Sequence, residues 1–118
     1  QGRDVFVDQR AMVRVLDNLV ANALRYADAI ILVTLSVVND MYQLTVEDDG
    51  PGIAKQDREA IFMPFSQLDN AQREASSEHG LGLAIVQQIA IWHKGSVEVS
   101  DSLLGGARFD IRWPHEYK

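Results

Sequence analysis

The sequence predicts an α+β fold, a two-layer sandwich in which helices cover one face of a β-sheet. The predicted elements follow one another as helix, two strands, helix, polar segment, helix and two strands, an order that favours this fold over a doubly wound parallel sheet. In residues 107–113, apolar side chains alternate with Arg108, Asp110 and Arg112, which indicates a sheet with one polar, uncovered face. We expect a mixed, mostly antiparallel sheet of about five strands, covered by three helices.

The composition is that of one small globular domain, spanning residues 1–118. Apolar residues make up 47% of the chain and charged residues 24%, values that argue against intrinsic disorder. The formal net charge of −6 makes the chain a poor candidate for nucleic-acid binding. With no cysteine, it has neither a thiol nucleophile nor a disulfide. No apolar run reaches the ~20 residues of a membrane span and no signal peptide opens the chain, so we expect a domain that is not itself membrane-embedded.

The first half of the chain predicts a helix followed by a hairpin. Apolar residues recur at helical spacing over residues 10–26, and Asp8 is a candidate N-cap for this helix. Two β-rich runs, at residues 30–38 and 41–48, flank Asn39-Asp40, a pair suited to a tight turn. These runs are therefore expected to be neighbouring strands.

The second half predicts two further helices and a second pair of strands. A short helix is expected at residues 55–62 and a longer one at residues 80–93, with Gly95 as its C-terminal stop. Between them, residues 66–79 are polar and lack any apolar period, which indicates a mobile loop or lid. The last two strands are expected at residues 96–101 and 107–113.

Three clusters of residues are candidates for chemistry, and the first lies on the first predicted helix. Asn18, Asn22 and Arg25 share a stripe beside the apolar face, and Tyr26 follows directly. An amide oxygen at such a boundary can ligate Mg²⁺ while water and phosphate complete the octahedron. The alternative is that the two asparagines only make polar contacts at the helix surface.

The second cluster ends the strand at residues 41–48. The strand period of two places Asp48 on the inward face, so that Asp49 points outward. An inward carboxylate is costly unless it is hydrogen-bonded, and a nucleobase amino group is one donor that satisfies it. Gly50 and Gly52 let a planar ring approach the backbone. The alternative is a strand-ending turn in which Asp48 accepts hydrogen bonds from its own loop.

The third cluster is Gly80-Leu81-Gly82, which opens a predicted helix after the polar segment. Backbone N–H groups at a helix N-terminus can converge on a phosphate. No Gly-Lys-Ser/Thr follows, so this is not a Walker A loop, and Ile85 stands where the dinucleotide fingerprint requires its third glycine. Taken alone, two glycines at a helix start are weak evidence and more often reflect packing.

Together, the three clusters resemble the catalytic ATP-binding domain of bacterial sensor histidine kinases, within the Bergerat-fold ATPases, and most of all the envelope-sensing kinases of proteobacteria. The likeness covers essentially the whole chain. Five segments carry the likeness. Residues 18–23 resemble the N box of the family, residues 48–53 its G1 box, residues 61–65 its F box, residues 80–86 its G2 box and residues 105–109 its closing strand motif. The resemblance implies the Bergerat fold, with the ATP lid at about residues 66–79.

The resemblance also implies ATP and Mg²⁺ as cofactors. It makes Asn22 the Mg²⁺ ligand and Asp48 the acceptor for the adenine amino group. The implied catalytic residues are Asn18, Asn22 and Arg25. The full set of implied nucleotide-binding residues is Asn18, Asn22, Arg25, Tyr26, Asp48, Gly50, Gly52, Ile53, Phe62, Phe65, Arg73, Gly80, Leu81, Gly82 and Leu83.

The lid region departs from the family pattern. Phe62 and Phe65 are implied to anchor the lid, although both also fit as core aromatic residues. Glu78 stands where the family often has glycine, and Gln67 where related lids often have arginine. Arg73 is then the candidate cation for the phosphates. These departures imply weaker nucleotide binding than is usual for the family.

The three histidines, His79, His93 and His115, are expected to be structural. None stands in the acidic and Pro-Leu context of a phospho-accepting histidine, and their spacing suggests no zinc site. His93 is expected near the end of the last helix, where a cation suits the helix dipole. The acceptor histidine is therefore implied to lie on another domain.

The resemblance implies transfer of the ATP γ-phosphate to a histidine on a separate dimerisation domain, with a response regulator as a further partner. Related ATPases that hydrolyse ATP have a glutamate at the position of Asn18, and a neutral amide is a poor general base. The alternatives are a degenerate nucleotide-binding or docking module with little catalysis, and a Bergerat-fold ATPase. We expect an isolated domain that is monomeric, within a homodimeric sensor kinase on the cytoplasmic side of the inner membrane.

Overall fold

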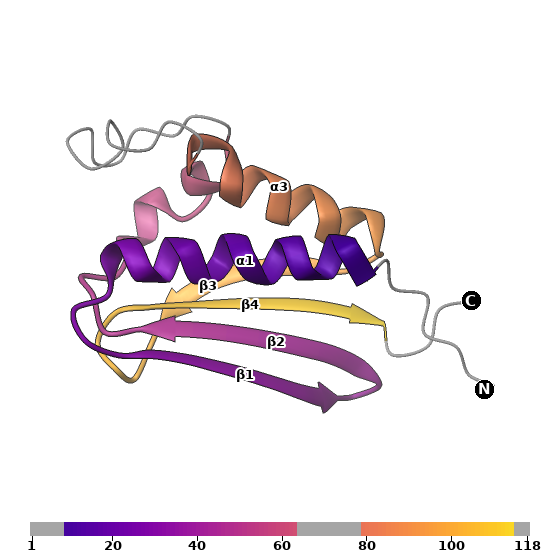
Figure 1. Ribbon diagram of the computed structural model, residues 1–118, viewed down its shortest axis with the longest axis horizontal. Helices are drawn as coiled ribbons and strands as arrows, with labels where there is room; N and C mark the ends of the chain where they lie inside the picture. Colours follow the sequence, from indigo (N-terminus) through magenta and orange to yellow (C-terminus); the bar gives the residue numbers. More distant parts are fainter. Residues whose placement is uncertain (1–8, 64–78, 115–118) are drawn as a thin grey trace.

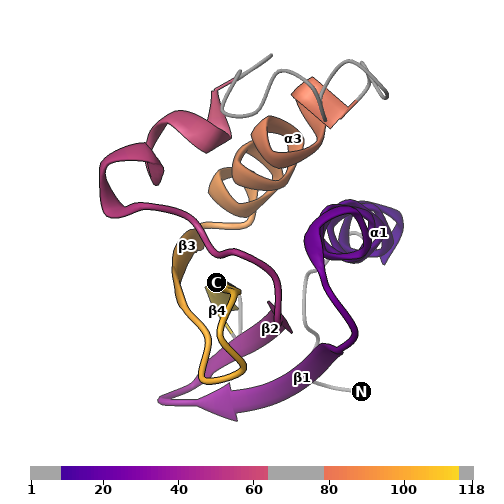
Figure 2. The same ribbon diagram turned by 90° about the vertical axis from the view of Figure 1, so that its left-hand side faces the viewer.

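Two helices lie on one side of a β-sheet in the computed structural model, which describes residues 9–63 and 79–114 (Figure 1). The helices are α1 (Gln9–Tyr26) and α3 (His79–Trp92). The strands are β1 (Ile31–Val38), β2 (Met41–Asp48), β3 (Ser96–Asp101) and β4 (Ala107–Pro114). The end-on view shows both helices on the same face of the sheet (Figure 2). This arrangement confirms the predicted α+β sandwich.

The sheet has the order β1-β2-β4-β3, and every neighbouring pair is antiparallel. The described residues thus form four strands in a fully antiparallel sheet, where about five strands in a mixed sheet were predicted. The alternation of polar and apolar residues along a strand shows which residues share a face, but it does not show which strands lie next to it in the sheet. The strand count and the pairing were therefore the weakest part of the prediction.

The hairpin between β1 and β2 forms as predicted. Asn39 and Asp40 have φ values of 53° and 64°, both in the left-handed region. Two successive left-handed residues define the type I′ turn, whose twist matches that of the flanking strands. The register then pairs Val38 with Met41 and Ile31 with Asp48, so the turn sets which β2 residues face the helices.

The short helix predicted at residues 55–62 forms instead as two 3₁₀ turns, η1 (Lys55–Asp57) and η2 (Ala60–Phe62). So short a segment makes few helical hydrogen bonds, and 3₁₀ geometry is common in such pieces. The α1 helix, these two turns and α3 make up the layer for which three helices were predicted.

The end of α3 differs in detail from the prediction. Lys94, with φ of 63°, adopts the left-handed conformation that ends the helix, one residue before Gly95, the predicted stop. The Gly95 N–H donates to the Ala90 carbonyl oxygen at 2.8 Å, as in a Schellman cap. A Cβ on Gly95 would collide with the Arg112 carbonyl oxygen of β4, so glycine is required there for close approach to the sheet. His93 Nδ1 lies 2.9 Å from the Ile89 carbonyl oxygen, at the helix end where a cation was expected.

The hydrophobic core lies between the helices and the three strands β2, β4 and β3. Its buried members are Val15, Leu19, Ala23, Leu44, Val46, Ile61, Phe62, Leu83, Val86, Ile89, Ala90, Ala107, Phe109, Ile111 and Trp113. The edge strand β1 contributes less, because α1 packs mainly against α3 and β2. Leu35, which pairs with Leu44 and so shares its face, is 63% exposed.

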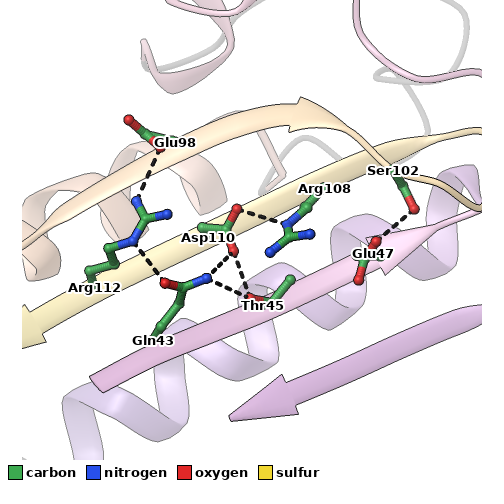
Figure 3. A network of polar contacts seen from close by, with 8 residues as sticks. All are labelled: Gln43, Thr45, Glu47, Glu98, Ser102, Arg108, Asp110 and Arg112. Atoms are coloured by element: carbon green, nitrogen blue, oxygen red, sulfur yellow. Dashed lines mark hydrogen bonds and ion pairs between the residues drawn. The ribbon is translucent and has the colours of Figure 1, made fainter. Parts of the chain in front are cut away.

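The opposite face of the sheet carries a polar network around Asp110 (Figure 3). Asp110 is 5% exposed and accepts hydrogen bonds from Thr45 Oγ1 at 2.6 Å and from Gln43 Nε2 at 3.0 Å. Arg108 forms an ion pair with it at 3.0 Å. Burial alone would raise the pKa of the Asp110 carboxyl, but the bonds from Thr45 and Arg108 hold it below the usual value. The predicted polar outer face is thus ordered by a buried carboxylate.

Candidate functional site

The predicted stripe on α1 lies at the edge of the core. Asn18, Asn22, Arg25 and Tyr26 are all half-buried, next to the fully buried apolar residues of the same helix. Asn18, Asn22 and Tyr26 are spaced by four residues, so they follow one side of the helix over about 12 Å. Each end of this stripe meets a different loop or helix.

At one end of the stripe, Asn18 faces Gly82 in the first turn of α3. A Cβ built on Gly82 would lie 3.7 Å from Asn18 Oδ1, an ordinary contact distance. The Asn18 Nδ2 is buried and has no hydrogen-bond partner among the described residues. The first N–H groups of a helix also lack acceptors within the helix. This corner therefore brings the Asn18 amide, with its unpartnered Nδ2 and with Oδ1 nearest Gly82, to a helix N-terminus. An anion is the ligand that suits both Nδ2 and the first N–H groups of the helix.

At the other end of the stripe, the loop after β2 comes very close to α1. A Cβ on Gly50 would collide with the carbonyl oxygen of Tyr26, so only glycine allows this approach. Gly50 was predicted to admit a planar ring, and the structure gives it a packing role as well. Gly52 has φ of 75°, in the left-handed region that favours glycine, and its Cβ would lie 3.6 Å from Gly106.

Asp48 lies beside this loop and is 2% exposed, on the inward face as predicted. Its Oδ1 accepts hydrogen bonds from the N–H groups of Gly50 at 2.8 Å and Ala107 at 3.3 Å. Its carbonyl oxygen accepts from the Gly106 N–H at 3.1 Å. For Oδ1, the structure therefore agrees with the alternative in which Asp48 accepts hydrogen bonds from its own loop. Within the described part of the chain no group donates to Oδ2, which leaves one carboxylate oxygen for a ligand.

Two predicted nucleotide-binding residues are core residues. Phe62 is 7% exposed, and its ring meets that of Phe109 edge to face, with 6.2 Å between centroids. This is what the core-aromatic alternative predicts for Phe62. Leu83 is 6% exposed, so its side chain packs inside the protein. Ile53 is half-buried, and its carbonyl oxygen accepts a hydrogen bond from Arg58 Nε at 3.0 Å.

The remaining predicted residues divide by position. Gly80 and Leu81 lie in the first turn of α3, beside Gly82. Phe65 and Arg73 lie outside the described residues. The N-cap candidate Asp8 and the two lid residues that depart from the family pattern, Gln67 and Glu78, also lie outside the described residues. So does the rest of the predicted lid, except His79, with which α3 begins.

Asp49 connects the loop after β2 to the turn after α1, a role that the sequence did not predict. Its carboxylate accepts backbone hydrogen bonds from Asp28 at 2.8 Å, Ala29 at 2.9 Å and Ile30 at 3.1 Å, in the turn between α1 and β1. The N–H groups of Ala29, Ile30 and Asp28 lower the pKa of Asp49 below its usual value. These contacts join residues about 20 positions apart, and no local sequence pattern indicates them.

The fold and the two ends of the stripe on α1 define a two-layer module, with the Asn18 amide beside a helix N-terminus at one end and a buried carboxylate at the other. Residues 7–117 match the family described as Histidine kinase-, DNA gyrase B-, and HSP90-like ATPase. The chain belongs to this family.

Relatives with curated names are sensor kinases. Over 114 residues the chain is 48% identical to Sensor protein RstB and 44% identical to Sensor histidine kinase CpxA, both of Escherichia coli strain K12. Each match covers 97% of this chain but only 26% and 25% of the respective relative. The chain therefore spans about a quarter of the length of these relatives. In the part of the chain that the structure describes, no helix is both long and apolar enough to cross a bilayer.

Solved structures similar to this chain are also histidine kinases. One is full-length ShkA in complex with AMPPNP, with a TM-score of 0.79 and 33% identity, covering 94% of this chain and 23% of that one. Another is the mycobacterial sensor histidine kinase MprB, with a TM-score of 0.76 and 28% identity, covering 91% of this chain and 72% of that one. At these identities, both the fold and the sequence support the family assignment.

Proposed function

We propose that this chain binds Mg-ATP and donates the γ-phosphate to a histidine on a separate dimerisation domain of a sensor kinase. The observation that carries the proposal is the corner formed by Asn18 and Gly82. The Asn18 amide lies beside the first turn of α3 with its Oδ1 nearest Gly82, and its buried Nδ2 has no partner among the described residues. A phosphate in this corner accepts hydrogen bonds from Nδ2 and from the first N–H groups of the helix. The ShkA structure, determined with an ATP analogue, supports the same choice of ligand.

The other end of the stripe suits the base of the nucleotide. Asp48 is already oriented by two backbone donors through Oδ1. We assign its second oxygen as the acceptor for the 6-amino group of adenine. Gly50, in the loop after β2, lies between Oδ1 of Asp48 and the carbonyl oxygen of Tyr26 at the end of α1, and we assign Tyr26 and Gly50 to the same base site. Gly52 and Ile53 continue this loop, and we assign them to the lining of the base site.

Asn22 lies one helical turn from each end of the stripe, and we assign it as the protein ligand of Mg²⁺. An amide oxygen is a hard ligand, and Mg²⁺ commonly takes one or two protein ligands together with water and substrate phosphates. The metal supplies charge neutralisation of the phosphates when it is bound. Arg25 is half-buried one helical turn beyond Asn22, and we assign its guanidinium to the phosphates as their cation on α1.

Transfer is favoured over hydrolysis by the chemistry of Asn18. A hydrolase needs a base that takes a proton from water, and a neutral amide cannot do so efficiently. An imidazole nucleophile needs no such base, since phosphoryl transfer depends mainly on positioning and charge neutralisation. A Bergerat-fold ATPase therefore remains only the second candidate.

The whole protein is proposed to be a homodimeric sensor kinase, of which this chain, residues 1–118 with a lid at about 66–79, is one catalytic domain. The isolated domain is then a monomer. Its partners are ATP, the histidine-bearing dimerisation domain and a response regulator. Because ATP is supplied inside the cell, the domain belongs on the cytoplasmic side of the inner membrane.

Two measurements on this chain test the proposal. Titration with Mg-ATP in a calorimeter is expected to show saturable binding, and a separately prepared histidine-bearing dimerisation domain is expected to gain acid-labile phosphate from labelled ATP. Absence of binding at millimolar nucleotide would favour the degenerate docking module. Steady phosphate release by the chain alone, without label on the histidine domain, would favour the ATPase.

Replacement of Gly82 by alanine separates nucleotide binding from folding. The new methyl group fits, because it would lie 3.7 Å from Asn18 Oδ1, and alanine is the better helix former by about 0.5–1 kcal/mol. It also fills the space that the phosphate is proposed to occupy. We expect an unchanged or higher melting temperature together with Mg-ATP affinity at least about tenfold lower, as for loss of one charged hydrogen bond. Gln88→Ala, at an exposed position of α3, is the control; equal affinity in both variants would contradict the phosphate site.

A further inference from the structure

Three consecutive residues at the end of β2 make three different long-range contacts. Asp48 accepts backbone hydrogen bonds from Gly106, in the loop before β4, and from Ala107, the first residue of β4. Gly50 lies against the Tyr26 carbonyl oxygen at the end of α1. Asp49 faces the turn that follows α1 and accepts N–H groups there. The segment is thus fastened both to the sheet and to the helix that carries the asparagine stripe.

We propose that Asp49 is a positioning residue for nucleotide recognition. By holding the turn after α1 against the loop after β2, its carboxylate sets the position of Asp48 relative to the stripe on α1. The inference rests on the proposed function, because it assigns Asp49 to the control of base recognition by Asp48. Asp49 itself does not contact the nucleotide.

The geometry of the carboxylate explains why it can hold the turn. Oδ1 accepts the N–H groups of Asp28, Ala29 and Ile30 at 2.8, 2.9 and 3.1 Å, and Oδ2 also accepts that of Ala29 at 3.1 Å. Hydrogen bonds to a charged acceptor are shorter and stronger than neutral ones. One side chain therefore supplies the acceptor for three successive backbone donors of a turn that has no glycine.

The close approach of Gly50 to Tyr26 explains how Asp49 can affect the position of Asp48. Gly50 can approach Tyr26 closely because it has no Cβ, but this contact only excludes other positions and does not attract. The bonds of Asp49 supply the attraction between the same two segments. Without them, the turn after α1 is held to this region only through the pairing of Ile31 with Asp48 in the sheet, and the position of the stripe on α1 relative to Asp48 is less fixed.

A purely structural role for Asp49 predicts a different result from a positioning role. Lower stability reduces the fraction of folded protein and leaves the selectivity of each folded molecule unchanged. A displaced Asp48 weakens the interaction with the adenine amino group in particular. The ratio of affinities for ATP and purine riboside triphosphate, which lacks the 6-amino group, measures this interaction directly.

The experiment compares this affinity ratio in the unmodified chain with that in Asp49→Ala, Asp49→Asn and the control Asp28→Asn. The control removes one charge from the same turn and keeps its backbone donors. We expect the ratio to fall about tenfold in Asp49→Ala, to be partly restored in Asp49→Asn, which keeps one acceptor oxygen, and to be unchanged in the control. Asp49→Ala with a lower melting temperature but an unchanged ratio would overturn the inference.

One further variant separates this inference from the proposed function. Asp48→Asn should lower the ratio whether or not Asp49 has a positioning role. If the unmodified chain does not discriminate between the two nucleotides, both the base site and the inference are wrong. If Asp48→Asn lowers the ratio and neither Asp49 variant does, only the inference is wrong.

Discussion

Replacement of Asn22 by alanine is expected to lower phosphoryl transfer from ATP by about 100-fold or more, because a catalytic metal contributes several kcal/mol of charge stabilisation. The variant should fold, since Asn22 is half-buried on α1 and alanine has a higher helix propensity than asparagine. The measurement is the rate of labelling of a histidine-bearing dimerisation domain, at several Mg²⁺ concentrations.

The dependence on metal makes this prediction specific. In the unmodified chain, ATP affinity should fall on removal of Mg²⁺ by a chelator, whereas in Asn22→Ala the chelator should have little further effect. Asp17→Ala, at an exposed position of the same helix, should behave like the unmodified chain. If Asn22→Ala binds Mg-ATP with normal affinity and normal Mg²⁺ dependence, the metal ligand lies elsewhere.

Replacement of Asp48 by alanine is expected to affect both stability and binding. Its Oδ1 accepts from the Gly50 and Ala107 N–H groups, and a buried donor left without an acceptor costs about 1–3 kcal/mol. We therefore expect a clear fall in melting temperature and a loss of ATP binding. Calorimetric unfolding and titration of the same sample measure the two effects.

Asp48→Asn separates these two effects. The asparagine keeps one oxygen for Gly50 and Ala107 but turns an NH₂ group toward the base, which cannot accept from the adenine amino group. We expect near-normal stability with ATP affinity lowered about 10–100-fold, the value of one hydrogen bond to a charged group. GTP, which presents a carbonyl oxygen at that position, should be affected less. Equal affinity for ATP and GTP in the unmodified chain would contradict the role of Asp48.

Much of the site was predictable because the relevant patterns are local. The period of two along β2 placed Asp48 on the inward face, and it is 2% exposed. The period of α1 placed Asn18 and Asn22 at the border of the core, where both are half-buried. Side-chain direction follows from backbone geometry within a single element, so a sequence can reveal it.

The remaining features depend on contacts between distant segments. Gly50 was interpreted as access for a ring, but it also allows α1 to approach the loop after β2. Asp49 was predicted only to point outward, and its partners lie 19 to 21 residues earlier in the chain. Leu83 was placed at the nucleotide, but its side chain packs in the core. A motif defines which residues occur together but not which of their atoms face the ligand.

By itself, the sequence determined the two long helices, the strand segments, their faces and the family, because periodicity, turn residues and motif spacing are properties of short segments. The tertiary structure alone decided that β4 lies between β2 and β3, that Asp48 is oriented by the Ala107 N–H at the start of β4, and that Asp49 ties the loop after β2 to the turn after α1. The reason is physical: strand neighbours and close backbone approaches depend on the packing of the whole chain, and local backbone preferences carry no record of them.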